Sequence, residues 1–205
     1  MAFVIVVIVV AAVALLTGGR LSNLKNLQFR FSWLVLAAVV LKVVTNSNLR
    51  YTLGISDLLA PKLYMVSLGL VALFVILNIA LRGMALIGLG LLGNLAAIFS
   101  NGGYMPLKRE YFMLIASAEE LEKINQGLPA YNYIATGPHT KLYYLSDIFL
   151  MPHWIFITKV FSIGDVLLTI GGCIFVWFFL KTPAKKKNGV LKSIGYRSND
   201  KDTVL

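Results

Sequence analysis

The chain has 205 residues, of which 58% are hydrophobic and only 14% charged, with a mean hydropathy of +0.78 and a net charge of +10. Soluble domains are about half apolar and about a quarter charged, so this composition excludes an ordinary water-facing globular surface. The basic residues flank apolar blocks and crowd the C-terminus, which indicates membrane topology rather than nucleic-acid binding. The single cysteine, Cys173, excludes an intrachain disulfide and a cysteine-based metal cluster.

The first two apolar blocks are short. Ala2–Leu16 ends at a pair of glycines, and no basic residue precedes the apolar run. A cleaved signal peptide needs a basic region before the run and a small-residue cleavage site after it, so we predict a retained helix. The second block covers residues 31–44, and Arg30 and Lys42 can extend it at either end by snorkelling.

Three further blocks complete the predicted membrane helices. Residues 63–81 follow a proline that suits a helix start, and Met84–Ser100 comes after only an Arg82-Gly83 turn. These two blocks are therefore predicted to form an antiparallel helical hairpin. The fifth block covers residues 160–180, and a polar, basic tail follows it.

A long segment, residues 101–159, separates the fourth and fifth blocks. Ser117 followed by Glu120 is a capping-box pattern, which predicts a short helix over Ala118–Asn125. Residues 142–157 are almost entirely apolar and aromatic but are interrupted by a proline and polar side chains. We expect this stretch to lie in the membrane interface or to fold back over the helices, with a sixth spanning helix as the weaker alternative.

These blocks predict an all-α membrane protein, a bundle of about five transmembrane helices with a long, partly helical external loop. The bundle covers residues 1–180 and includes the external loop 101–159, whereas residues 181–205 form a basic tail that we expect to be disordered. The distribution of Lys and Arg predicts a multi-pass protein of the cell membrane, with the N-terminus outside and the tail in the cytoplasm. The lipid bilayer is the expected partner, other membrane proteins are the alternative, and no nucleic-acid partner is expected.

Small and polar residues inside the helices have structural interpretations. Residues 88–93 match the G-x-G-x-x-G pattern of dinucleotide-binding loops, but they lie inside an apolar helix with no strand before them. In a membrane helix, small residues allow a neighbouring backbone to approach closely, so we expect Gly90 and Gly93 to mark a packing face. Asn78 and Asn94 are expected to make interhelical hydrogen bonds, with a polar site in the bundle as the sharper alternative.

The outer face carries the candidate binding residues. Ser162 and Asp165 form a helix-capping pattern, although Asp165 is also a candidate ligand-binding residue. Asp147 lies in the apolar segment, where a buried carboxylate needs a donor or a cation. We therefore hypothesise that this segment folds over the outer mouth of the bundle and that four residues converge there: Asn101, Tyr104, Asp147 and Asp165.

His139 is a further candidate ligand-binding residue of the same loop. Together with Asp147 and His153 it supplies side-chain types that bind metals, but the spacing matches no known metal site. We therefore predict no metal and no cofactor. The sequence also contains no catalytic motif, so no catalytic residue is proposed and an enzymatic activity is not expected.

The segments NGGYMP and FSIGD, read with the stretches around them, resemble a family of small bacterial membrane proteins known only as a domain of unknown function. The resemblance runs from about residue 18 to residue 172. It implies a common architecture and no reaction, and it implies that the outer-face segments are the distinctive ones. The matching positions are Gly18, Gly19, Arg20, Asn94, Asn101, Gly102, Gly103, Met105, Pro106, Asp147, Ser162, Gly164 and Asp165, whereas Ser146 replaces an expected glycine.

Three classes of function follow from these features. The first is a protein that binds a lipid or a small apolar ligand at the outer face, which the aromatic segment 142–157 favours. The second is an accessory or scaffold subunit of a membrane complex, favoured by small-residue helix faces and by the lack of charges at the helix centres. The third, and the weakest, is a lipid-modifying membrane enzyme using Asp147, His139 and Asp165.

Overall fold

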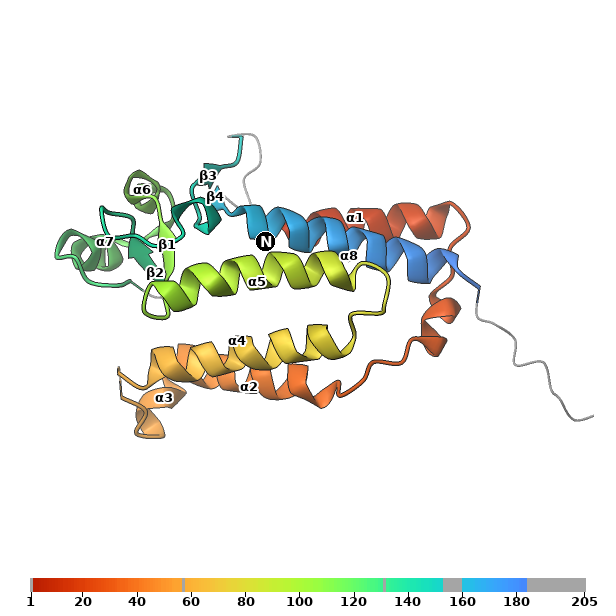
Figure 1. Cartoon of the computed structure of the whole chain (residues 1–205), viewed down its shortest axis with the longest axis horizontal. Coiled ribbons are helices and arrows are strands. Elements are labelled where there is room, and N and C mark those ends of the chain that lie inside the picture. Colours follow the sequence, from red (N-terminus) through yellow and green to blue (C-terminus); the bar gives the residue numbers. More distant parts are fainter. Residues whose placement is uncertain (1, 57, 131, 153–159, 184–205) are drawn as a thin grey trace, which may run out of the picture.

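The computed structural model describes residues 2–56, 58–130, 132–152 and 160–183. The described chain is mostly helical, with short strands between the fourth and fifth long helices (Figure 1). In chain order the elements are α1 (Ala2–Leu16), η1 (Leu21–Asn26), α2 (Trp33–Asn46), α3 (Leu49–Thr52), α4 (Ala60–Leu77), α5 (Met84–Ser100), β1 (Met105–Leu107), η2 (Arg109–Tyr111), α6 (Phe112–Ile115), α7 (Ala118–Asn125), β2 (Tyr133–Ala135), η3 (Tyr143–Leu145), β3 (Phe149–Leu150), β4 (Val160–Phe161) and α8 (Ile163–Lys181).

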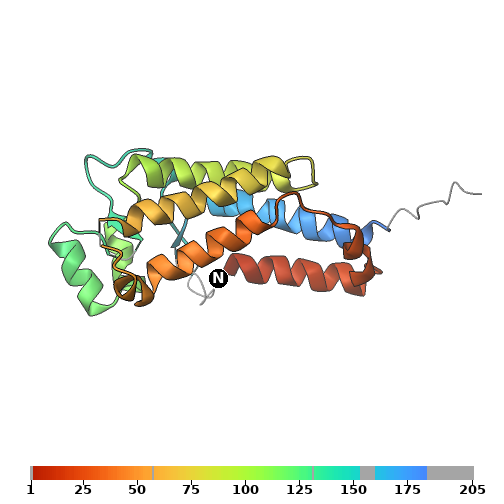
Figure 2. The same ribbon diagram turned by 90° about the horizontal axis from the view of Figure 1, so that it is seen from below.

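The long helices form two packed groups, and their axes lie roughly along one line. Helix α8 packs against both α1 and α5, while α2 packs against α4. Successive long helices alternate in direction, and the segment between α5 and α8 forms a loop domain at one end (Figures 1 and 2). The turn after α1, the turn between α4 and α5, and the end of α8 lie at the opposite end.

Local sequence explains where these helices begin and end. Pro61 lies in the first turn of α4, where its missing N–H costs nothing. Gly83 has a φ of 88°, which lets the chain reverse immediately before α5. The predicted hairpin of two helices around Arg82-Gly83 is therefore present. Helix α4 ends at Leu77 rather than near residue 81, because the backbone changes there to turn bonds, from the Ile79 N–H to the Ile76 carbonyl and from the Leu81 N–H to the Asn78 carbonyl.

The number of helices that can cross a membrane differs from the sequence-based expectation. We expected about five, but among the described residues only α4 and α8 are both long and apolar enough. Helices α1, α2 and α5 are apolar but have 15, 14 and 17 residues. Turns cut them short: a positive φ at Phe31 immediately precedes α2, and glycine turns follow α1 and α5.

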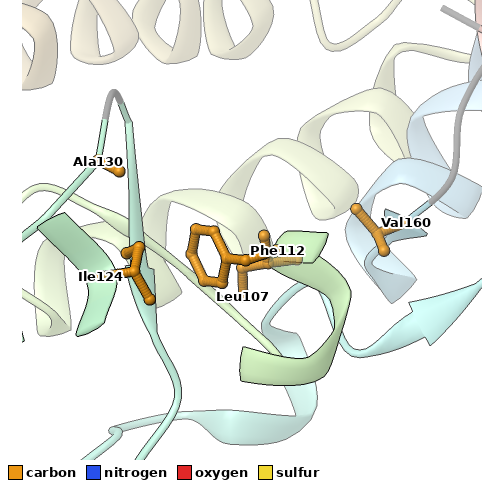
Figure 3. Packing of buried hydrophobic residues seen from close by; sticks show 5 residues of the cluster. All are labelled: Leu107, Phe112, Ile124, Ala130 and Val160. Atoms are coloured by element: carbon orange, nitrogen blue, oxygen red, sulfur yellow. The ribbon is translucent and has the colours of Figure 1, made fainter. Parts of the chain in front are cut away.

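The loop domain has its own small hydrophobic core. Strands β1 and β2 pair in parallel, with Met105 opposite Tyr133 and Leu107 opposite Ala135. Figure 3 shows Phe112 beside Leu107, with Ile124 on one side and Val160 on the other. The strands are a departure from the all-α expectation, whereas the predicted helix Ala118–Asn125 and its Ser117–Glu120 capping box are confirmed.

The aromatic segment contains no spanning helix over its described part, residues 142–152. It forms the short turn η3, which contacts α5 and α8, and the strand β3, which pairs antiparallel with β4. The segment therefore folds back over the ends of these helices, which is the arrangement that its sequence favoured. His153 and the remainder of the segment, residues 153–159, lie outside the described residues, as does the tail from residue 184.

Candidate functional site

A close seam between α5 and α8 fixes the geometry of the end of the bundle that carries the loop domain. A Cβ atom added to Gly90 would lie 2.4 Å from the Gly164 carbonyl oxygen, and one on Gly164 would lie 1.9 Å from the Asn94 side chain. Only glycine fits at these two positions because the two backbones are in direct contact. Gly93 has no such restriction, since a Cβ atom added there would have the Leu145 side chain as its nearest neighbour, at 3.9 Å.

At the end of this seam, Asn94 joins the capping box that starts α8. Asn94 Nδ2 donates to Asp165 Oδ1 at 3.0 Å, and Ser162 Oγ donates to Asn94 Oδ1 at 2.8 Å. The Ser162 backbone N–H donates to Asp165 Oδ2 at 3.0 Å, and the Asp165 N–H donates to Ser162 Oγ at 3.1 Å. The predicted cap is confirmed, and both oxygens of Asp165 are already occupied by donors.

Asp147 lies near this network but does not take part in its hydrogen bonds. Its backbone is held beside β1, because its N–H donates to the Pro106 carbonyl and its own carbonyl accepts from the Lys108 N–H. The residue is only 6% exposed, and Oδ1 has no hydrogen-bond partner among the described residues. Burial, together with the negative charge of Asp165, raises the pKa of the Asp147 carboxyl to about 7.

The other predicted binding residues make their contacts elsewhere. Asn101 fastens the loop at residue 141: its Nδ2 donates to the Lys141 carbonyl at 2.8 Å and its Oδ1 accepts from the Lys141 N–H at 3.0 Å. His139 is exposed in a turn. Tyr104 lines a separate cleft. The structure thus brings Asp147 and Asp165 together, whereas Asn101 binds residue 141, Tyr104 lines the separate cleft and His139 is exposed.

The cleft that Tyr104 lines has a volume of about 810 Å³ and lies between the ends of α2 and α4 and the loop domain. Its walls combine polar groups with tyrosines and prolines. The lining residues are Thr45, Asn46, Ser47, Asn48, Arg50, Tyr51, Ala60, Pro61, Tyr64, Gly103, Tyr104, Ser117, Glu119, Glu120, Lys123, Leu128, Pro129 and Asn132. A volume of this size accommodates a small-molecule ligand or a lipid head group.

The charged groups of the cleft are balanced in sign. On the α3 wall, Arg50 lies over the Tyr51 ring at 4.5 Å from its centroid. On the α7 wall, Lys123 forms an ion pair with Glu119 at 2.7 Å, and Glu120 accepts the Ser117 backbone N–H. The two walls are close enough for Tyr51 to contribute to raising the pKa of Lys123, although Glu119 is the larger cause.

Most of this cleft was not singled out from the sequence. Residues 45–51 form a polar stretch after an apolar helix, which is typical of any loop. The one distinctive feature of this stretch is an Arg-Tyr pair, and it indicates a cleft only once α7 is known to lie opposite it. Tyr104 was the one lining residue that the outer-face hypothesis included.

Comparison with curated proteins and with solved structures finds no match to this chain. The family of unknown function DUF5317 matches residues 26–177, which is most of the chain and includes the hairpin, the loop domain and most of α8. The resemblance to an uncharacterised family is thereby confirmed. By this match, the chain belongs to the family of unknown function DUF5317.

Proposed function

We propose that this protein is a multi-pass membrane protein that holds the polar head group of a zwitterionic lipid in the cleft lined by Tyr104. The membrane assignment and the ligand assignment have separate supports. The observation that carries the ligand assignment is the charge-balanced, tyrosine-walled cleft at the ends of the apolar helices.

The apolar surface of the bundle supports the membrane assignment. Helices α4 and α8 are apolar along their length, yet only 22% and 17% of the residues in their most hydrophobic stretches are buried. The core helix of a soluble protein would be mostly covered. Val4, Leu36 and Leu89 are likewise more than half exposed on the three shorter helices. Hydrocarbon is the environment in which such surfaces are stable.

Five crossings require the shorter helices to be extended at their ends. A bilayer core of about 30 Å needs about 20 residues of helix, with a range of about 17–25, and α5 reaches the lower end of that range. Helices α1 and α2 are shorter still, so flanking turns and snorkelling side chains complete their crossings. If the helices cross, the loop domain and the end of α8 lie on opposite sides of the membrane, because they are at opposite ends of the bundle.

The charge distribution supports an orientation with the loop domain outside. The end away from the loop domain carries basic residues, whereas all acidic side chains of the described residues belong to the loop domain or the first turn of α8. Basic residues near helix ends favour the cytoplasmic side. The basic residues at that end are Arg20, Lys25, Arg30, Arg82 and Lys181.

The cleft supports a zwitterionic ligand in preference to an anionic one. The described lining residues include Arg50 and Lys123 as cations and Glu119 and Glu120 as anions, so their charges sum to zero. An anionic head group would meet the Glu119 and Glu120 carboxylates as well as the two cations, whereas a phosphate with an attached ammonium group can be matched to both signs. Tyr51, Tyr64 and Tyr104 add apolar wall area with polar ends, which suits the membrane interface.

The test is lipid retention by native mass spectrometry after purification in mild detergent, with phosphatidylethanolamine and phosphatidylglycerol as probes. Asn48→Trp fills the cleft from the start of α3, and Thr52→Trp is the matched control on the same helix outside the cleft. The wild type and Thr52→Trp should retain phosphatidylethanolamine, and Asn48→Trp should lose it.

Two outcomes would overturn the ligand assignment. Equal retention of both lipids by all three proteins would mean that the lipid covers the apolar helices and not the cleft. A stoichiometric protein partner that co-purifies with the wild type, and is lost in Asn48→Trp, would assign the cleft to a membrane complex instead.

A further inference from the structure

The Asp147 carboxyl has a position that its own hydrogen bonds do not explain. The backbone of the residue is fixed by two hydrogen bonds to the β1 segment, so the peptide would keep this place with another side chain. The residue is only 6% exposed, and its Oδ1 is buried and meets no donor within the described residues. A buried carboxylate without a donor or a cation is strongly unfavourable.

The surroundings of Asp147 increase that cost. Asp165, on α8, is the charged neighbour that acts on it, and its effect is repulsive. On the β1 side, Lys108 forms an ion pair with Glu110. From η3, Tyr143 and Tyr144 are the titratable groups, and Tyr143 interacts with Lys108. The Asn94 and Ser162 groups nearby are already committed to Asp165 and to each other.

A proton is the ligand that removes this cost with the atoms present. Protonation neutralises the carboxyl, ends the repulsion by Asp165 and supplies an O–H group in place of a bare oxygen. A metal ion is less well supported, because both Asp165 oxygens already accept hydrogen bonds from Asn94 and Ser162. Within the described part of the chain, no group of three or more metal-ligating side chains lies here either.

We propose that Asp147 is a proton-binding site that fastens residues 143–150 to the start of α8 when it is protonated and releases them when it is ionised. Ionisation would leave a charge in a buried, donor-poor place next to Asp165, and moving the segment into water relieves it. This inference rests on the Asp147–Asp165 geometry and is independent of the lipid-binding cleft.

The sign of the pH dependence follows from the pKa of Asp147, which is about 7 in the folded protein against an ordinary value of 3.8. Between these values the folded state binds more protons than the unfolded state, so stability falls as pH rises and levels off above about 7. Between pH 5 and pH 7 this amounts to about fifty-fold in the folding equilibrium. In a chain of this size, that change corresponds to a melting shift of about 5–10 °C.

The first experiment compares two proteins in detergent from pH 5 to pH 8 by their melting temperatures. Both carry His139→Gln and His153→Gln, because histidines titrate in the same range, and one of them also carries Asp147→Asn. Asparagine mimics the neutral carboxyl, so the two proteins should melt alike at pH 5, and Asp147→Asn should be the more stable at pH 8. A constant difference across the range would overturn the proposal.

The second experiment measures release of the segment directly. Ser146, which is fully buried, is replaced by cysteine in a Cys173→Ala background, and its labelling rate is measured with and without Asp147→Asn. Comparing the two proteins at each pH cancels the pH dependence of thiol chemistry. Their ratio should be near one at pH 5 and should rise about ten-fold or more by pH 8 in favour of the Asp147 protein.

A metal ion is tested in the same samples. Addition of Ca²⁺ or Na⁺ at pH 8 should leave the melting temperature of the Asp147 protein unchanged relative to Asp147→Asn. Stabilisation by either ion that disappears in Asp147→Asn would overturn the proton assignment and would assign a cation site to Asp147.

Discussion

Asn78 and Arg30 are joined by a reciprocal pair of hydrogen bonds: the Asn78 side chain binds both backbone groups of Arg30. Its Oδ1 accepts from the Arg30 N–H at 2.8 Å and its Nδ2 donates to the Arg30 carbonyl at 2.9 Å. Asn78 also donates to the Phe74 carbonyl at 2.8 Å, and it is almost fully buried. One amide thus holds the entry to α2 against the end of α4.

Replacing Asn78 with Leu should destabilise the protein by about 1–3 kcal/mol, because the Arg30 backbone groups lose their partner in a buried place. Thermal denaturation in detergent measures this, with the exposed substitution Gln126→Leu as the control. A melting curve for Asn78→Leu that matches the control would show that water replaces the amide without cost.

The two glycines of the predicted packing face should differ sharply when changed to alanine. Gly90→Ala places a methyl group against the Gly164 backbone and should cost about 1–3 kcal/mol through overpacking. Gly93→Ala has room, and alanine is the better helix former by about 0.5–1 kcal/mol, so it should be neutral or stabilising. Melting temperatures of the pair decide this; equal losses would contradict the seam geometry.

The two capping serines differ in exposure: one caps its helix at the surface and the other in a buried place. Ser117→Ala removes an exposed cap and should cost about 1 kcal/mol. Ser162→Ala should cost more, since it also leaves Asn94 Oδ1 without its donor. A double-mutant cycle of Ser162→Ala with Asn94→Ala should give a coupling of about 0.5–3 kcal/mol, whereas additive effects would show that the two side chains act independently.

Membrane topology is tested by labelling single cysteines in intact cells with an impermeant thiol reagent, in a Cys173→Ala background. Lys123→Cys, on exposed α7, should be modified, and Lys186→Cys, in the basic tail, should be protected until the cells are opened. Lysed cells, in which both positions must react, provide the control. The opposite pattern in intact cells would reverse the orientation.

Local rules predicted the features that local sequence determines. The capping boxes at Ser117 and Ser162 and the turn at Gly83 depend on a few adjacent residues, and each was read correctly. The lengths of the long helices were harder to predict, because apolar composition continues through Phe31 and past Leu77 although the hydrogen-bonded helix does not. The short strands β1 and β2 lie far apart in the chain and carry no alternating pattern.

The candidate site shows the same difference between features that local sequence determines and features that tertiary packing determines. The sequence indicated that Asp147 would enter an apolar place and would need a donor or a cation there, and its burial agrees with the first part. That Oδ1 would meet no donor depends on how Asn94 and Ser162 are committed elsewhere, which no local pattern contains. The cleft was missed because its walls come from α3 and α7, and the sequence gives no reason to pair them.

The packing of α1 on α8 has a consequence for how the chain is assembled. The Leu180 carbonyl at the end of α8 accepts hydrogen bonds from the Arg20 N–H and from Asn23, so the first and last helices are fastened to each other. Because α8 is made about 150 residues after α1, ribosomal synthesis delays their meeting by roughly 10–30 seconds. During that interval α1 has no α8 to pack against, and a nascent chain interrupted before α8 would present that face of α1 to whatever insertion or quality-control machinery surrounds it.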